Sequence, residues 1–412
     1  MVTVPTRARP RHTRPSRSRQ SGPGGTRRRD TRRYAALAVL LYLAVRAVSL
    51  LITLWASPHS AGTTLYLLGT HWDSDRYLHI AQWGYGPAPH LPLPHTDQTK
   101  FSDLAFFPLL PAAMAGVHAV LPFLPWSAVG PLVSTLASCV AAWGVHAAVA
   151  TRFGRRVATL TVLLWGMAPA AIIENTAYSE SLFTAFAAWA LWALVERRWL
   201  TAAVLCVLAG LTRPTAVAVI AALVLLAALE VYRRFRGGRD EASEPLWRPV
   251  AAAVIAPLGL LGYLTWTGLL LHSPTAYLQL QAQWHSRFDF GASCARDVVR
   301  LFTSRAPLSV YYPVDLGVLG VAVLLTGFAA YRRHPPAFLV FSLVTVLLAV
   351  GDSAHLASRP RLLLCAFPLL VPVASGLNRL RSRPLTVVVL IAATVASACY
   401  CAYSYYISPG AP

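Results

Sequence analysis

The stretch Tyr34–Ala56, YAALAVLLYLAVRAVSLLITLWA, is apolar over almost its whole length and carries one charged side chain, Arg46. About 20 such residues in a helix cross the roughly 30 Å hydrocarbon core of a bilayer. Similar runs recur along the 412-residue chain and alternate with short polar links. Because the runs are continuously apolar, they predict helices and argue against a membrane β-barrel. We therefore expect an all-α polytopic membrane protein.

The composition agrees with a membrane protein and argues against nucleic acid as a partner. The chain is 56% hydrophobic and 13% charged, whereas a soluble domain carries about 25% charged residues. Its net charge of +20 comes from arginines in the first 33 residues and in short links between apolar runs. That distribution is typical of cytoplasmic loops, helped by anionic membrane lipids. No nucleic-acid-binding module accompanies the charge.

Three segments are expected along the chain. Residues 1–33 are rich in Arg, Pro, Ser and Gly, which predicts a disordered basic tail in the cytoplasm. The apolar run that follows has no small-residue cleavage site, so it is interpreted as a signal anchor. Residues 34–407 form a single transmembrane domain, and residues 408–412 are a short tail.

About eleven crossings are expected, with ten as the alternative. The spans are Tyr34–Ala56, Ser127–Ala150, Val157–Ile173, Tyr178–Val195, Trp199–Leu211, Thr215–Val231, Val250–Leu271, Val310–Ala330, Ala337–Gly351, Leu362–Ser375 and Leu385–Tyr406. Eleven crossings place every arginine cluster of a short link in the cytoplasm, as the positive-inside rule requires. The N-terminus is then cytoplasmic and the C-terminus is outside.

Two choices underlie this topology. The stretch Phe106–Leu124 contains three prolines, so it is expected to lie at the interface or to re-enter without crossing. Trp199–Val231 is expected to cross twice, because the residue before Pro214 disfavours helix. One tilted helix is the alternative for that segment.

The long first outer loop contains the stretch His71–Tyr85, which predicts a short amphipathic helix on the membrane surface, with Tyr77 and Ile80 on its apolar face. Asp73 lies at the start of this helix. It is either the helix N-cap or a general base at the mouth of a membrane cavity, and the two roles are compatible. Asp75 is expected to pair with His79 four positions later.

Three outer arginines, Arg213, Arg359 and Arg361, oppose the positive-inside trend. A guanidinium fork suits phosphate, and a lipid-linked phosphate would lie at this depth. The alternatives are snorkelling and pairing with acids. The acids available are Glu174, Glu180 and Asp352. Arg46, in the middle of a span, is by the same reasoning either functional or paired.

No metal or other cofactor is expected. The outer loops show no recognisable ligand spacing, and the six cysteines show no C-x-x-C pattern. Five of the cysteines lie in apolar runs and are interpreted as small core residues. Cys294 lies in a polar loop, without an evident partner in the sequence.

Five motifs, in order, resemble those of the PIG-V type mannosyltransferases, also known as the GPI mannosyltransferase 2 family. The first is W-D-x3-Y-x2-I-A-x2-G-Y from Trp72 to Tyr85. The others are F-F-P-L-L-P at Phe106–Pro111, Y-S-E-S-L-F at Tyr178–Phe183, L-T-R-P at Leu211–Pro214, and R-L-x4-F-P-L at Arg361–Leu369. The family usually has Tyr at the position of Leu362, which puts one donor contact in doubt.

This resemblance implies a GT-C-like bundle and a membrane glycosyltransferase. Such an enzyme moves a sugar, here mannose, from a polyprenyl-phosphate carrier to an extracytoplasmic hydroxyl with inversion. Asp73 takes the position of the presumed base. The expected substrate-binding residues are Trp72, Tyr77, Tyr178, Glu180, Arg213, Arg359 and Arg361. The acceptor is an unidentified lipid, glycan or protein.

Two other classes compete with the glycosyltransferase. Transporters and flippases tend to show internal repeats and ionisable residues near mid-membrane, and here Arg46 is the main such residue. A non-catalytic subunit of a glycosyltransferase complex is the third possibility.

Overall fold

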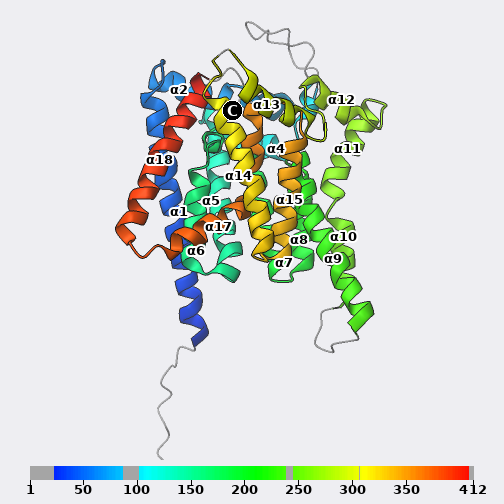
Figure 1. Cartoon of the computed structure of the whole chain (residues 1–412). Helices are drawn as coiled ribbons and strands as arrows, with labels where there is room; N and C mark the ends of the chain where they lie inside the picture. The colour runs from blue at the N-terminus through cyan, green and yellow to red at the C-terminus, as the bar shows by residue number, and fades with distance from the viewer. Residues whose placement is uncertain (1–22, 87–101, 238–244, 306, 408–412) are drawn as a thin grey trace, which may run out of the picture.

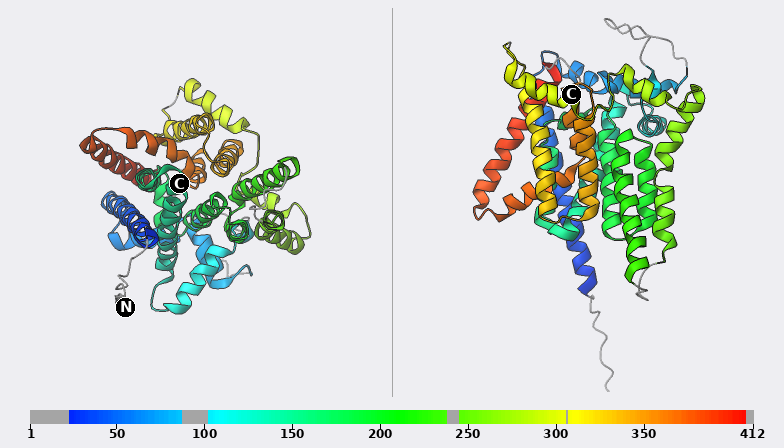
Figure 2. Two further views of the ribbon diagram at one scale, coloured as in Figure 1. Left: turned by 90° about the horizontal axis from the view of Figure 1, so that it is seen from below. Right: turned by 45° about the vertical axis from the view of Figure 1, so that its right-hand side comes forward.

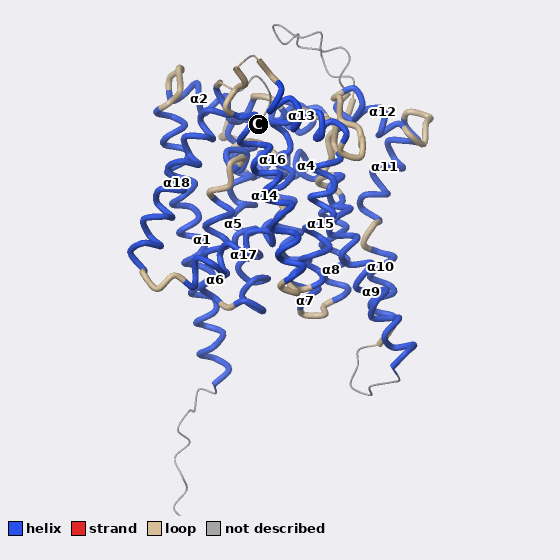
Figure 3. Tube along the Cα trace, viewed as in Figure 1, coloured by secondary structure: helices blue, strands red, loops and turns tan. Residues whose placement is uncertain are grey.

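The computed structural model describes residues 23–86, 102–237, 245–305 and 307–407, which form a bundle of α-helices (Figure 1). Within these ranges no strand is formed, and the one β-type contact is an isolated bridge between Phe288 and Asp352. Loops gather at the two ends of the bundle and its middle is helical (Figure 3), as a bilayer interior requires. The expected all-α polytopic architecture is confirmed.

Helices of three kinds build the bundle. The long ones are α1 (Pro23–Trp55), α5 (Trp126–Phe153), α9 (Val217–Gly237), α14 (Tyr311–Tyr331) and α18 (Arg383–Tyr406). Shorter ones within the bundle are α6 (Arg155–Gly166), α7 (Glu180–Val195), α8 (Trp199–Gly210), α10 (Trp247–Ile255), α11 (Leu258–Leu270), α15 (Pro336–Gly351), α16 (Arg359–Leu364) and α17 (Val371–Arg379). At the upper end in Figure 1 lie α2 (Ala61–Thr70), α3 (Asp73–Trp83), α4 (Leu109–Val120), α12 (Ala276–Gln283) and α13 (Ala292–Thr303). Single 3-10 turns are η2 (Asp103–Ala105), η3 (Ala171–Asn175), η4 (Pro214–Ala216), η5 (Leu356–Ser358) and η6 (Phe367–Leu370).

Six segments of the described chain are long and apolar enough to cross a membrane. They are Arg32–Trp55, Trp126–Phe153, Pro214–Gly237, Trp247–Leu270, Tyr311–Tyr331 and Arg383–Tyr406. A seventh is a pair of helices, Leu356–Leu364 and Phe367–Arg379, bent by 81°. The remaining expected spans each contain a helix, but α6, α7, α8 and α15 have 16 residues or fewer. Eleven crossings thus stays a prediction beyond these segments.

Both topological choices agree with the arrangement of the helices. α8 and α9 run in opposite directions and are joined by a turn toward the upper end, and α4 lies near that end without crossing (Figures 1 and 2). The turns that carry arginine clusters lie at the lower end, together with the start of α1 (Figure 1). α18 ends at the upper end. By the positive-inside rule we expect the lower end to be cytoplasmic.

One boundary differs from the expectation. α1 begins at Pro23, so residues 23–33, assigned to a disordered tail, are helical. Proline suits the first position of a helix, and arginine is among the better helix formers, so the anchor helix extends past its apolar part. Residues 1–22 and 408–412 lie outside the described residues.

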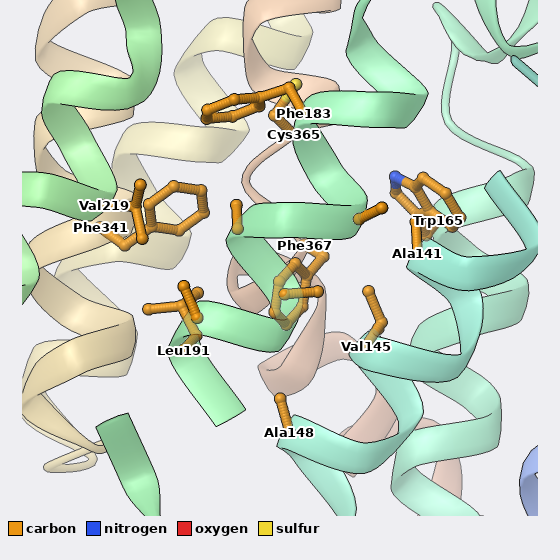
Figure 4. Close-up of a cluster of buried hydrophobic side chains, with 14 of the residues drawn as sticks. Ala141, Val145, Ala148, Trp165, Phe183, Leu191, Val219, Phe341, Cys365 and Phe367 are labelled. Carbon is orange, nitrogen blue, oxygen red and sulfur yellow. The ribbon is translucent and has the colours of Figure 1, made fainter. Parts of the chain in front are cut away.

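Small residues let the central helices approach closely, as is common in membrane bundles. A Cβ on Gly130 of α5 would collide with Ala177, and one on Gly144 would come within 2.9 Å of the Trp189 ring. In the core, aromatic side chains such as Phe341 and Phe367 pack between the helices, with these two ring centroids 6.5 Å apart (Figure 4). The close packing of α5 against α7 fixes the position of the α7 N-terminus along the axis of the bundle.

We expect Gly130→Val to destabilise the protein by about 1–3 kcal/mol, because the added carbons overpack the contact with Ala177. The measurement is thermal unfolding of the purified protein in detergent. The matched control is Gly317→Val in α14, where a Cβ meets nothing within 4 Å. Equal stability of the two variants would contradict the close-packing argument.

Candidate functional site

The site begins at the first turn of α3. The helix starts at Asp73, and the residue before it, Trp72, has φ of 59° and makes no capping hydrogen bond. Such a backbone costs about 1–3 kcal/mol for a residue other than glycine, and it persists only where surrounding structure holds it. The capping interpretation of Asp73 is therefore wrong. Its carboxylate points instead to Arg361, whose Nη1 donates to Asp73 Oδ2 at 2.8 Å.

Hydrogen bonds join α3 to the segment that precedes α7. The Ala177 N–H donates to Ser74 Oγ at 3.2 Å, and the Tyr77 hydroxyl donates to Ser179 Oγ at 2.9 Å. The Asp73 N–H lies 3.4 Å from the Tyr178 hydroxyl oxygen, which accepts it. Burial raises the pKa of Tyr77, so its hydroxyl stays protonated and able to donate. Tyr77 and Ile80 are buried, which confirms the apolar face expected for this helix.

Four charged side chains meet where α3, α7, the α8–α9 turn and α16 come together. Arg361 pairs with Asp73 and, through Nε at 3.5 Å, with Glu180 Oε1. Arg213 pairs with the same Glu180 oxygen. We call these four residues the charged cluster. It holds two acids and two arginines and is formally neutral.

The two ion pairs differ in depth. The Glu180 side chain is 2% exposed and that of Arg213 is 9% exposed, whereas Asp73 and Arg361 are 17% and 18% exposed. Glu180 lies in the first turn of α7, where the helix dipole favours a negative charge. The Arg361 guanidinium carbon also lies 5.4 Å from the Tyr178 ring centroid. The cluster is thus nearly closed to solvent at Glu180 and partly exposed to solvent at Asp73.

Most residues predicted from the sequence lie in or beside this cluster. Asp73, Glu180, Arg213 and Arg361 form it, and Tyr77, Tyr178 and Trp72 adjoin it through α3 and the start of α7. The Trp72 indole packs against the main core, and its buried Nε1 has no hydrogen-bond partner among the described residues. In such a cluster a carboxylate can accept a proton, and guanidinium groups can bind an anion.

Arg359 does not join the cluster. It is 1% exposed and donates to Ser293 Oγ at 2.9 Å and to the Asp352 carbonyl at 3.1 Å. Its Nη1 lies 3.4 Å from Asp297 Oδ2. These contacts tie α13 to the start of α16. Arg359 is therefore paired, but with Asp297, which was not among the acids expected from the sequence.

Arg46 is also paired inside the bundle. Its Nε lies 3.6 Å from Glu174 Oε2, it donates to the Gly166 carbonyl at 3.1 Å, and it contacts Asn175. The Tyr42 hydroxyl donates to the same Glu174 carboxylate at 2.7 Å. This network links α1 to η3, the 3-10 turn that shortly precedes Tyr178 in the chain. It therefore helps to hold the segment that leads into the site.

Asp103 was missed by the sequence analysis. It lies in η2, with Oδ1 at 3.2 Å from Arg76 Nη1 and Oδ2 at 2.6 Å from His79 Nδ1. The expected pairing of His79 with Asp75 is therefore wrong. Burial raises the pKa of Asp75, against the opposing charges of Arg76 and His79. The four-residue spacing on one helix favoured Asp75 as the partner of His79. Asp103 lies 24 residues after His79, and nothing in the sequence indicates that the two side chains meet.

The described residues contain no group of three or more His, Cys, Asp or Glu side chains that could hold a metal ion. All six cysteines are free.

Comparison with known proteins identifies the fold and does not identify a family. No family model matches the chain, and no curated protein matches it. Among solved structures, the chain is similar to ArnT from Cupriavidus metallidurans bound to undecaprenyl phosphate, with a TM-score of 0.51 and 14% identity over 86% of this chain. It is also similar to ArnT from the same organism in the apo state, with a TM-score of 0.50 and 16% identity over 91% of this chain. The chain spans 63% and 65% of those two proteins, respectively. The expected GT-C-like bundle is confirmed at the level of the fold.

We expect Arg359→Gln to destabilise the protein by about 1.5–3 kcal/mol, because it removes charged hydrogen bonds that are buried. The control is Arg296→Gln on α13, whose side chain is 74% exposed and pairs with Asp289 at 3.9 Å, and which should change stability by less than about 1 kcal/mol. Thermal unfolding in detergent checks both. Unchanged stability of Arg359→Gln, with weaker binding of undecaprenyl phosphate, would support the substrate-binding role instead.

Proposed function

We propose that this protein is a membrane glycosyltransferase that takes its sugar from a polyprenyl-phosphate carrier. The observation that supports this most is the charged cluster at one end of a GT-C-like bundle. In it a partly exposed carboxylate, Asp73, pairs with Arg361, and Glu180 holds Arg361 and Arg213 together. A similar structure, ArnT, binds undecaprenyl phosphate. The two proteins share a fold, and the chemistry of the cluster suits the same class of ligand.

The reaction is a single displacement at the anomeric carbon. The acceptor oxygen forms a bond to that carbon while the bond from the carbon to the carrier phosphate oxygen breaks, which inverts the configuration. Asp73 accepts the proton of the acceptor hydroxyl. The electron pair of the broken bond stays on the departing phosphate, where Arg361 and Arg213 stabilise the added negative charge.

The sugar is proposed to be mannose, and this assignment rests on the five motifs that resemble the PIG-V type family. The acceptor is proposed to be a lipid, glycan or protein hydroxyl on the extracytoplasmic side. The arginine clusters at the opposite end of the bundle (Figure 1) support this side through the positive-inside rule.

The direct experiment is transfer of labelled mannose from polyprenyl-phosphate mannose by the purified protein, with extracted membrane lipids and glycans as acceptors. We expect Asp73→Asn to lower the rate by about 10²–10⁴-fold, the usual contribution of a general base. Asp75→Asn, the same change two residues along α3, should retain most of the rate. Full turnover by Asp73→Asn would exclude Asp73 as the base.

A second variant tests the anion-binding part of the cluster. We expect Arg213→Gln to lower kcat by about 10²–10³-fold, because a charged donor aimed at the departing phosphate is lost. Thermal unfolding should accompany the rate measurement, since Glu180 would lose one of its two partners. A folded variant with an unchanged kcat would remove Arg213 from the reaction.

The competing functions give different results in the same preparation. Saturable lipid or sugar uptake into proteoliposomes without a transfer product would favour a transporter. Full activity of a separate partner enzyme in the presence of an Asp73→Asn, Arg361→Gln double variant would favour a non-catalytic subunit.

A further inference from the structure

The proposed base, Asp73, and the proposed phosphate-binding arginine, Arg361, are hydrogen-bonded to each other in this structure. Arg361 Nη1 donates to Asp73 Oδ2 at 2.8 Å, a typical charge-assisted distance. The carboxylate oxygen that accepts from Arg361 is occupied, so it is less available to an acceptor hydroxyl. An arginine held by a carboxylate is likewise less available to a phosphate. The contact therefore opposes both steps of the reaction.

We propose that the donor phosphate and the Asp73 carboxylate compete for Arg361, so that donor binding releases Asp73 to act as the base. This inference rests on the proposed function and adds an order to it. The donor binds first, and only then does the site have a free carboxylate for an acceptor hydroxyl. Water entering an empty site would meet a carboxylate still paired to Arg361.

The depth of the two ion pairs indicates which one opens. The pair between Glu180 and Arg213 is nearly closed to solvent, with side chains 2% and 9% exposed, whereas the pair between Asp73 and Arg361 is 17–18% exposed. A ligand arriving from outside therefore reaches the outer pair first. Breaking the inner pair would leave a buried carboxylate short of a partner, at a cost of several kcal/mol. Exchange at the Asp73 side is the less costly one.

Arg361 keeps other contacts when it leaves Asp73. Its Nε lies 3.5 Å from Glu180 Oε1, and its guanidinium lies over the Tyr178 ring. Within the described chain Nε makes no hydrogen bond, so the ion pair with Glu180 is its contact. In the proposed exchange, Nε stays near Glu180 while Nη1 turns from Asp73 to the phosphate.

The second arginine strengthens the phosphate site. Arg213 and Arg361 both pair with one oxygen of Glu180, so two positive groups lie close together on a single acid. A bridging phosphate would relieve their mutual repulsion and accept from both forks.

The competition also explains how the cycle would close. During transfer Asp73 gains a proton and the phosphate gains negative charge, which holds Arg361 on the phosphate. When Asp73 loses its proton to solvent, its carboxylate again competes for Arg361 and promotes release of the carrier phosphate.

The test is binding of undecaprenyl phosphate, without any sugar transfer, to the purified full-length protein in detergent micelles at pH 8. If Arg361 is free in about one tenth of wild-type molecules, Asp73→Asn should bind the lipid about tenfold more tightly, because the apparent affinity scales with the competent fraction. Isothermal titration measures the affinity. Undecaprenol, which lacks the phosphate, should show no difference between the proteins.

Two controls isolate the contact from general charge. Asp75→Asn removes a carboxylate from the same helix but, within the described chain, the ion-pair partners of Arg361 are Asp73 and Glu180. It should tighten binding by less than about twofold. In an Arg361→Gln background, Asp73→Asn should have no effect on affinity, which is the signature of a direct coupling in a double-mutant cycle. Thermal unfolding confirms that each variant is folded.

The outcomes separate this inference from the proposed function. Tighter binding that is specific to Asp73→Asn and depends on Arg361 supports the competition. Unchanged or weaker binding by a folded Asp73→Asn overturns it, while mannose transfer by the wild type would leave the glycosyltransferase proposal intact. Absence of saturable binding in every protein would overturn both.

Discussion

Glu180 is a carboxylate almost completely buried at the end of a bundle of apolar helices. The organisation of the site follows from the ion pairs that neutralise its charge. Removing an ion from water costs several kcal/mol, and the cost is recovered only through well-placed partners. Two arginines supply them, Arg213 from the α8–α9 turn and Arg361 from α16. One acid thereby holds together three parts of the chain, and through Arg361 it reaches Asp73 on a fourth.

Contacts made by α5, α1 and η3 hold Glu180 in that position. Close contact of α5 with the start of α7 requires Gly130, where any side chain would collide with Ala177. On the other side, Arg46 and Glu174 join α1 to η3 in a buried network. The segment between η3 and α7 contains Ala177, Tyr178 and Ser179, which form hydrogen bonds with α3. The surface helix with Asp73 is therefore fixed by the same residues that place Glu180.

The cluster is asymmetric, and its asymmetry is the basis of its proposed chemistry. The inner pair is nearly closed to solvent, and in our proposal the outer pair exchanges partners with an incoming anion. Arg359, only two residues from Arg361, instead contacts Ser293 of α13 and the Asp352 carbonyl. Neighbouring arginines of similar local sequence context thus serve different ends, one holding the outer loops together and one facing the site.

The class of fold, the places where helices occur and the gathering of arginine clusters at one end could be predicted without a structure, because they depend on composition and on the bilayer as solvent. Motifs in the chain also singled out Asp73, Glu180, Arg213 and Arg361. The acid that each arginine contacts became known only from the folded chain. Asp73 bonds Arg361 instead of capping its helix, and His79 meets Asp103 instead of Asp75. Partners in these pairs can lie hundreds of residues apart, and local spacing carries no information about such distances.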